Sequence, residues 1–259
     1  MSGDANMTDR ARDTIRAQAW SGLIVLFPAL AGWLLLYWGA THMSSPAARL
    51  TMPMDDWSAA NWLAVFVMWA VMMAAMMLPT AAPMVSVFAT LNHRRGQAGR
   101  TIAFVAAYLA LWTAFAAAAT AAQWALQAAG WLSPMIVSMS SALSAALLLI
   151  AGVFQFTPLK HVCLRACRSP LGFLMTDWRD GLWGAARMGM RHGSFCIGCC
   201  WALMALLFVG GAMNLLWIAA LTLLVAIEKI APKGEMLANA LGAVMIGAGV
   251  ARLVWPSAF

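Results

Sequence analysis

Charged side chains are scarce in this sequence. Asp, Glu, Lys and Arg make up 10% of the 259 residues, whereas hydrophobic residues make up 63%. A soluble domain of this length cannot bury so much apolar surface, so we expect the solvent around the chain to be lipid. The hydrophobic runs extend for about 20 residues without alternating with polar positions, which favours transmembrane helices over a β-barrel.

The familiar catalytic motifs are also missing. The sequence has no H-E-x-x-H pair, no P-loop and no dinucleotide-binding glycine fingerprint. No acid or histidine falls in the middle of a hydrophobic run, which argues against a proton-coupled pump, a membrane metalloprotease and a haem protein with two histidine ligands. Ser194 has no intramembrane histidine partner, which argues against a serine protease. We therefore expect no catalytic turnover.

The hydrophobic runs predict an all-α fold, a polytopic transmembrane helical bundle of about seven spans that form one domain over residues 19–255. Residues 1–18 are predicted to be a polar cytoplasmic segment, and residues 158–193 a cytoplasmic loop with cysteines and an interfacial amphipathic segment. A partly re-entrant loop is the alternative for residues 171–192. The predicted spans cover residues 19–39, 60–90, 102–127, 135–157, 194–212, 214–231 and 235–255.

The basic residues predict the orientation of this bundle. Fourteen of the 16 Lys and Arg residues fall on one side of the seven predicted spans, and only Arg49 and Arg252 fall on the other. Because basic residues accumulate on the cytoplasmic side, we expect a cytoplasmic N-terminus and a periplasmic or otherwise extracytoplasmic C-terminus, in a bacterial inner membrane. The net charge of +7 then reflects topology and attraction to anionic lipid, so the bilayer is the expected partner and nucleic acid is not.

The five cysteines occur in two short segments, and we refer to them together as the five-cysteine cluster. Cys163 and Cys167 lie one helical turn apart in a basic segment that Pro158 is expected to start and Pro170 to end. Cys196, Cys199 and Cys200 have the i, i+3, i+4 spacing of one helix face. The predicted topology places both groups at the reducing face of the membrane, which argues against structural disulfides.

The surroundings of these cysteines favour the thiolate form, which is the form that binds metals. Basic residues surround Cys163 and Cys167, and Cys196 follows the predicted start of a span, where the positive end of the helix dipole lies. Thiolates and thioethers select Cu(I) first, and Zn(II) is the alternative. Zinc would use four of the cysteines, or cysteines together with His161 or His192.

Other soft or charged residues are candidate accessory positions. Methionine is also a common core filler, the outer loop is also consistent with an ordinary connection, and Glu228 has Lys229 and Lys233 as nearby ion-pair partners. If the outer residues sample metal, the methionines of the second span provide weak exchange sites on the way to the cysteines. The accessory candidates are Met72, Met76 and Met204 in the spans, His42, Met43, Met52 and Met54 in the first outer loop, and Glu228 and Lys229 at the inner end of the sixth span.

Four motifs together resemble a bacterial family of predicted metal-binding integral membrane proteins. They are MWAVMMAAMMLP at 68–79, TPLKHVCLRACRSP at 157–170, FCIGCCWALM at 195–204, and Glu228-Lys229. The resemblance extends over about residues 60–231 and implies a multi-span, copper-linked protein. It carries the metal-binding role over to the five-cysteine cluster and to Glu228-Lys229.

Three functions remain open at this point. The first is Cu(I) handling, delivery or transport, with a metallochaperone or a cuproenzyme under assembly as the partner. The second is a membrane thiol-disulfide protein that uses Cys199-Cys200 or the Cys196/Cys199 pair. The third is an assembly subunit whose cysteines hold a structural zinc.

Overall fold

The protein is helical throughout its described part, which confirms the all-α prediction. The structure, a computed structural model, describes residues 2–53, 56–93 and 97–255. Apart from one isolated β-bridge between Leu132 and Ser138, the described elements are helices. They are α1 (Ser2–Thr41), α2 (Pro46–Leu50), α3 (Ala59–His93), α4 (Ala98–Ala128), α5 (Ser141–Phe154), α6 (Pro158–Arg168), α7 (Pro170–Asp177), α8 (Gly181–Ala205), α9 (Leu207–Gly210), α10 (Leu215–Ile230) and α11 (Gly234–Val254).

Five helical segments in the described part are long and apolar enough to cross a membrane. A sixth is obtained only if α5 and α6, which meet at 66°, count as one broken span. Seven spans are not supported, because α5 has 14 residues and α10 has 16. At 1.5 Å per residue these helices are about 21 and 24 Å long, shorter than the roughly 30 Å of a bilayer core. The five segments are Gln18–Thr41, Ala59–His93, Ala98–Ala128, Gly181–Gly210 and Gly234–Val254.

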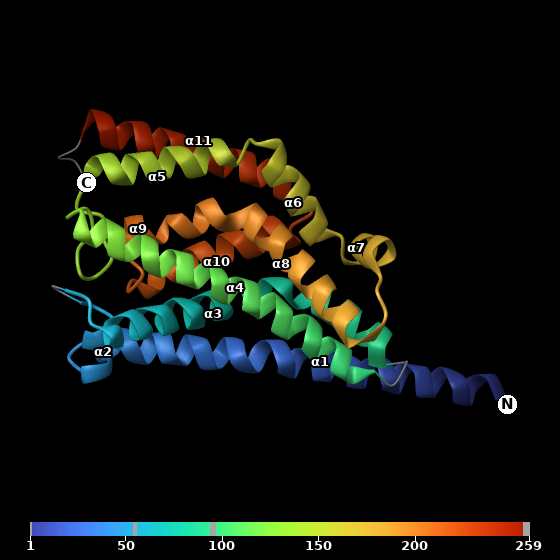
Figure 1. Cartoon of the computed structure of the whole chain (residues 1–259). Helices are drawn as coiled ribbons and strands as arrows, with labels where there is room; N and C mark the ends of the chain where they lie inside the picture. Colours follow the sequence, from blue (N-terminus) through green and yellow to red (C-terminus); the bar gives the residue numbers. More distant parts are fainter. Residues whose placement is uncertain (1, 54–55, 94–96, 256–259) are drawn as a thin grey trace.

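The long helices lie side by side in one bundle (Figure 1). Helix α1 packs on α3, α4 packs between α3 and α8, and α5 pairs with α11. The short helix α6 crosses α8, and α10 contacts α3, α6 and α8. The N-terminus and the C-terminus lie at opposite ends of the bundle (Figure 1). Helices α6 and α10, which carry Cys163, Cys167 and Lys229, therefore both contact α8 and also contact each other.

The outer surface of α1 is strongly apolar. Leu23, Phe27, Leu30 and Leu34 form a stripe along this helix, and each is between 61% and 73% exposed. Their spacing of three or four residues places them on one helix face, while Val25 and Ala29 are buried against the rest of the bundle. A helix that is apolar on both its inner and outer faces is typical of a membrane protein.

Helix α8 begins earlier than the sequence predicted. It starts at Gly181, not at residue 194, so residues 171–192 do not form one interfacial helix but are divided between α7 and the first half of α8. Gly189 in this segment allows close packing, because a Cβ there would collide with the backbone carbonyl oxygen of Phe104 in α4. Cys196 therefore lies deep within α8, and the predicted effect of a helix N-terminus on its thiol is wrong.

Candidate metal centre

Helices α6 and α8 bring the two cysteine segments together. Pro158 starts α6 behind the N-cap Thr157, as the sequence predicted, and the helix ends at Arg168 before Pro170. Gly198 lets α6 approach closely, because a Cβ at that position would lie only 2.7 Å from Cys163 Sγ. Cys167 Sγ lies 4.0 Å from Cys199 Sγ. One cysteine of each segment thus lies beside the other, and their role as metal ligands stays a prediction.

The thiols differ in their access to the surface. All five cysteines are free; Cys163, Cys196, Cys199 and Cys200 are buried, and Cys167 is half-buried. The Cys199 and Cys200 thiols both donate to the carbonyl oxygen of Cys196, at 3.2 and 2.9 Å. Cys167 is therefore the member of the five-cysteine cluster with the best access to a second molecule.

Cys196 is surrounded by polar groups from three other helices. Lys229 Nζ in α10 lies 3.0 Å from Cys196 Sγ and donates to Thr80 Oγ1 in α3, also at 3.0 Å. The hydroxyl of Tyr108 in α4 lies 3.1 Å from the same sulfur and donates to the carbonyl oxygen of Met77 at 3.2 Å. A thiolate that binds metal here would accept a hydrogen bond from the Lys229 ammonium group. It would accept one from the Tyr108 phenol only if that O–H turned away from the Met77 carbonyl oxygen.

Glu228 takes part in a buried network next to the thiols. Its carboxylate accepts from Lys160 Nζ at 2.6 Å and from Gln155 Nε2 at 2.9 Å, while Arg168 donates to its backbone carbonyl at 3.1 Å. Lys160 is 0% exposed, so it does not lie in a solvated loop. The partner of Glu228 is thus Lys160 in place of the neighbouring Lys229 or Lys233. This ion pair holds α6 against α10 and so positions Cys163 and Cys167.

The two histidines considered as zinc ligands have different environments. One ring nitrogen of His161 lies 3.2 Å from Asn239 Oδ1, so this side chain turns toward α11. His192 is buried one turn before Cys196, and its ring lies 5.7 to 5.9 Å from those of Phe104, Tyr108 and Phe173. The Nδ1 atom of His192 has no hydrogen-bond partner in the described structure.

Methionine sulfur reaches the cysteines at a position that the sequence analysis did not single out. Met72, Met76 and Met204 are buried, in agreement with either core packing or a soft-metal role. It is Met77, however, whose Sδ lies 4.0 Å from Cys200 Sγ. Sequence reasoning also missed Tyr108 and Thr80. Tyr108 is one of only two tyrosines and stands in an otherwise apolar run, a signal that could have identified it.

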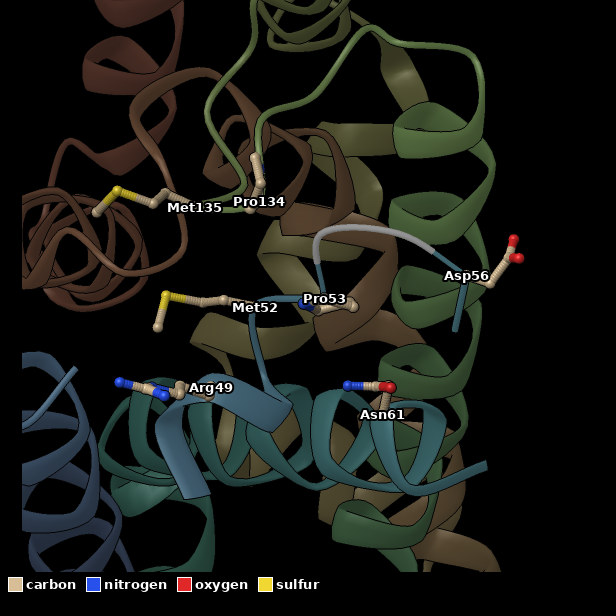
Figure 2. Close-up of a pocket in the computed structure, with 7 residues that line it drawn as sticks. All are labelled: Arg49, Met52, Pro53, Asp56, Asn61, Pro134 and Met135. Atoms are coloured by element: carbon tan, nitrogen blue, oxygen red, sulfur yellow. The ribbon is translucent and has the colours of Figure 1, made fainter. Parts of the chain in front are cut away.

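The described candidates in the first outer loop, His42, Met43 and Met52, have contacts away from the five-cysteine cluster. His42 stacks on Trp38, with ring centroids 5.4 Å apart, and Met43 is exposed. Met52 lines a pocket of about 550 Å³ in which its side chain and that of Met135 extend to the same side, beside Arg49 (Figure 2). The positive charge of Arg49 disfavours a metal cation in this pocket. Met54 lies outside the described residues.

The sulfur positions suit a soft cation with few ligands. No group of three or more His, Cys, Asp or Glu side chains in residues 2–53, 56–93 and 97–255 has the arrangement of a metal site. A metal–thiolate bond to zinc is about 2.3 Å long. An ion of similar size bound to Cys199 could therefore also be reached by Cys167, because the two sulfurs are 4.0 Å apart. Cu(I) is the soft ion that such thiolate and thioether donors select.

Fold and site together define an all-helical protein with a buried thiol cluster between its helices. The family model of the PpoB2 copper chaperones matches residues 66–252, a segment that includes the five cysteines and Lys229. Because the match extends over well more than half of the chain, the protein belongs to this copper chaperone family. The copper link expected from the sequence motifs is thereby confirmed. The comparisons with curated proteins and with solved structures gave no match.

Proposed function

We propose that this chain is an integral membrane Cu(I) chaperone that binds one ion through the thiolates of Cys196 and Cys199 and releases it through Cys167. The observation that carries the proposal is the position of Cys167. The residue is half-buried on α6, and its sulfur lies 4.0 Å from that of the buried Cys199. An exchange ligand needs this combination of contact with the bound ion and access from outside.

The surroundings support Cu(I) as the cargo. Met77 offers a thioether beside Cys200, and thioethers are ligands of Cu(I) more than of zinc. The chain belongs to a copper chaperone family. The partner is then a metallochaperone or an apo-cuproenzyme that presents its own soft ligands to Cys167.

The membrane setting is part of the same proposal. Apolar helices such as α1 face lipid in a bacterial inner membrane, with the N-terminus in the cytoplasm and the C-terminus outside. With α6 at the cytoplasmic end of the bundle, as this proposal requires, the half-buried Cys167 would stay reduced and available for exchange. Binding and delivery of Cu(I) need only the proposed cysteine site. Movement of copper across the bilayer would also need the methionines of α3 as exchange positions.

Metal content and release test this proposal. The wild-type chain, Cys196→Ser, Cys167→Ser and the exposed control Ser194→Ala are purified without oxygen after growth with copper. Wild type, Ser194→Ala and Cys167→Ser should hold about one copper ion per chain, and Cys196→Ser should hold almost none. Cys167→Ser should also release copper to a soluble thiol chelator at least about tenfold more slowly than wild type. Equal copper content and equal release rates in all four proteins would contradict the proposal.

A further inference from the structure

The side chain of Lys229 links α10 to Thr80 in α3 and to Cys196 in α8, and its positive charge has a further role. We propose that its ammonium group is the counter-ion of the bound cargo, and that its single charge limits the site to one Cu(I) held by two thiolates. This inference rests on the proposed function, because it concerns the net charge of the copper–thiolate complex that the same site is proposed to bind.

The contacts of Lys229 set it apart from the other buried lysine. It is 7% exposed, and its Nζ lies 3.0 Å from both Cys196 Sγ and Thr80 Oγ1. The ion pairs between described residues include one for Lys160, with Glu228, and none for Lys229. A buried ammonium group without a carboxylate is costly unless another anion accompanies it. The nearest group that becomes anionic on binding a metal is the Cys196 thiol.

Neighbouring Glu228 does not supply that anion, because helix geometry separates the two side chains. Successive residues of an α-helix differ in direction by about 100°. Glu228 faces Lys160 of α6 and Gln155 at the C-terminal end of α5, and each donates a hydrogen bond to one of its carboxylate oxygens. Lys229 faces α3 and α8 instead. Two adjacent residues of α10 therefore have different roles. Glu228 forms an ion pair that holds α6, whereas Lys229, on another face of α10, places its ammonium group beside the Cys196 thiol.

The charges then determine the complex. Each cysteine that binds the ion gives up its proton, so Cu(I) with two thiolates carries one net negative charge. The ammonium group of Lys229 balances this charge within the apolar bundle. A third thiolate, or zinc with four thiolates, would leave an uncompensated negative charge among buried side chains. Any third donor should therefore be neutral.

Substitutions that separate charge from hydrogen bonding test this role. Lys229→Gln keeps hydrogen-bond donors but loses the charge, and Lys229→Arg keeps the charge. Anaerobic competition against a chromophoric Cu(I) chelator should show affinity reduced about 10- to 100-fold in Lys229→Gln. Lys229→Arg should stay within about threefold of wild type, as should Lys233→Gln, which removes an exposed charge one turn further on. Lys229→Met provides a second neutral variant if Lys229→Gln does not fold.

The outcomes separate this inference from the proposed function. If wild type binds Cu(I) tightly and a folded neutral variant at position 229 binds it equally well, the counter-ion role is wrong and the chaperone function stands. A loss in Lys229→Arg as large as in Lys229→Gln would show that shape, not charge, is required, and would also overturn the role. If wild type binds no Cu(I), the proposed function fails and the role of Lys229 fails with it. A structural role alone would lower the thermal stability of the metal-free variants without changing their relative Cu(I) affinities.

Discussion

Replacing Cys199 by serine is expected to weaken Cu(I) binding by more than about 100-fold, because it removes one of two thiolates, whereas losing an outer-shell group costs about 10- to 100-fold. Cys200→Ser is the matched control, with the same chemical change at the next position of α8. Its sulfur faces Met77 in α3, not Cys167 in α6, so affinity should fall by no more than about tenfold. Anaerobic competition with a chromophoric Cu(I) chelator measures both variants.

The comparison of these adjacent cysteines locates the ion. Both thiols are buried and both donate to the carbonyl oxygen of Cys196, so their structural roles are closely similar. A larger loss in Cys200→Ser than in Cys199→Ser would place the ion between Cys200 and Met77. Cys167 would then not be the exchange ligand.

The second large effect concerns the stability of the fold. Glu228→Gln should lower the free energy of unfolding by about 3–5 kcal/mol, because it leaves the Lys160 ammonium group buried without a charged partner. The two side chains are 0% and 1% exposed and lie 2.6 Å apart. Reversible denaturant unfolding of the protein in mild detergent, followed by circular dichroism, measures the loss.

An exposed ion pair between α6 and α11 provides the control for this experiment. Arg165 and Glu235 lie 3.5 Å apart, with side chains 66% and 44% exposed. Glu235→Gln should therefore cost less than about 1 kcal/mol. Replacing both buried partners, as Lys160→Met with Glu228→Leu, should recover most of the stability lost in Glu228→Gln. Equal losses in Glu228→Gln and Glu235→Gln would show that the buried pair does not stabilise the position of α6.

Much of the architecture follows from local patterns in the sequence. Long apolar runs predict helices because backbone groups in lipid must be satisfied within the segment, and each predicted span contains a helix in the structure. Pro158 predicts the start of α6 because its fixed φ and missing N–H suit the first turn of a helix. The four-residue spacing of Cys163 and Cys167 places both thiols on one face of α6.

Helix lengths were harder to predict. Hydropathy reports how apolar a run is but not where the chain turns, so the short helices α5 and α10 appeared as full spans. The start of α8 was placed too late, because Leu182 and Trp183 opposite Arg187 and Arg191 indicated an interfacial helix, and the four glycines between 172 and 189 indicated a weak one. In the folded chain some of these glycines allow close packing, as Gly189 does against Phe104 of α4.

The polar contacts of the site depend on pairs far apart in the sequence. Lys160 looked like a positive-inside signal just after a span, and its burial depends on Glu228, 68 positions later. Tyr108 reaches Cys196 across 88 positions, and Lys229 reaches Thr80 across 149. A single sequence carries no information on such pairings, so the cysteines could be predicted as a site but the groups around them could not.

X-ray absorption at the copper edge of the anaerobically loaded protein tests the central claim, that thiolates from this cluster hold Cu(I). We expect a Cu(I) edge and a first shell made only of sulfur, with about two to three donors at roughly 2.3 Å or slightly less. The same spectrum should lose sulfur scattering in Cys199→Ser. A first shell of nitrogen or oxygen donors, or a sulfur shell that is unchanged in Cys199→Ser, would contradict the account.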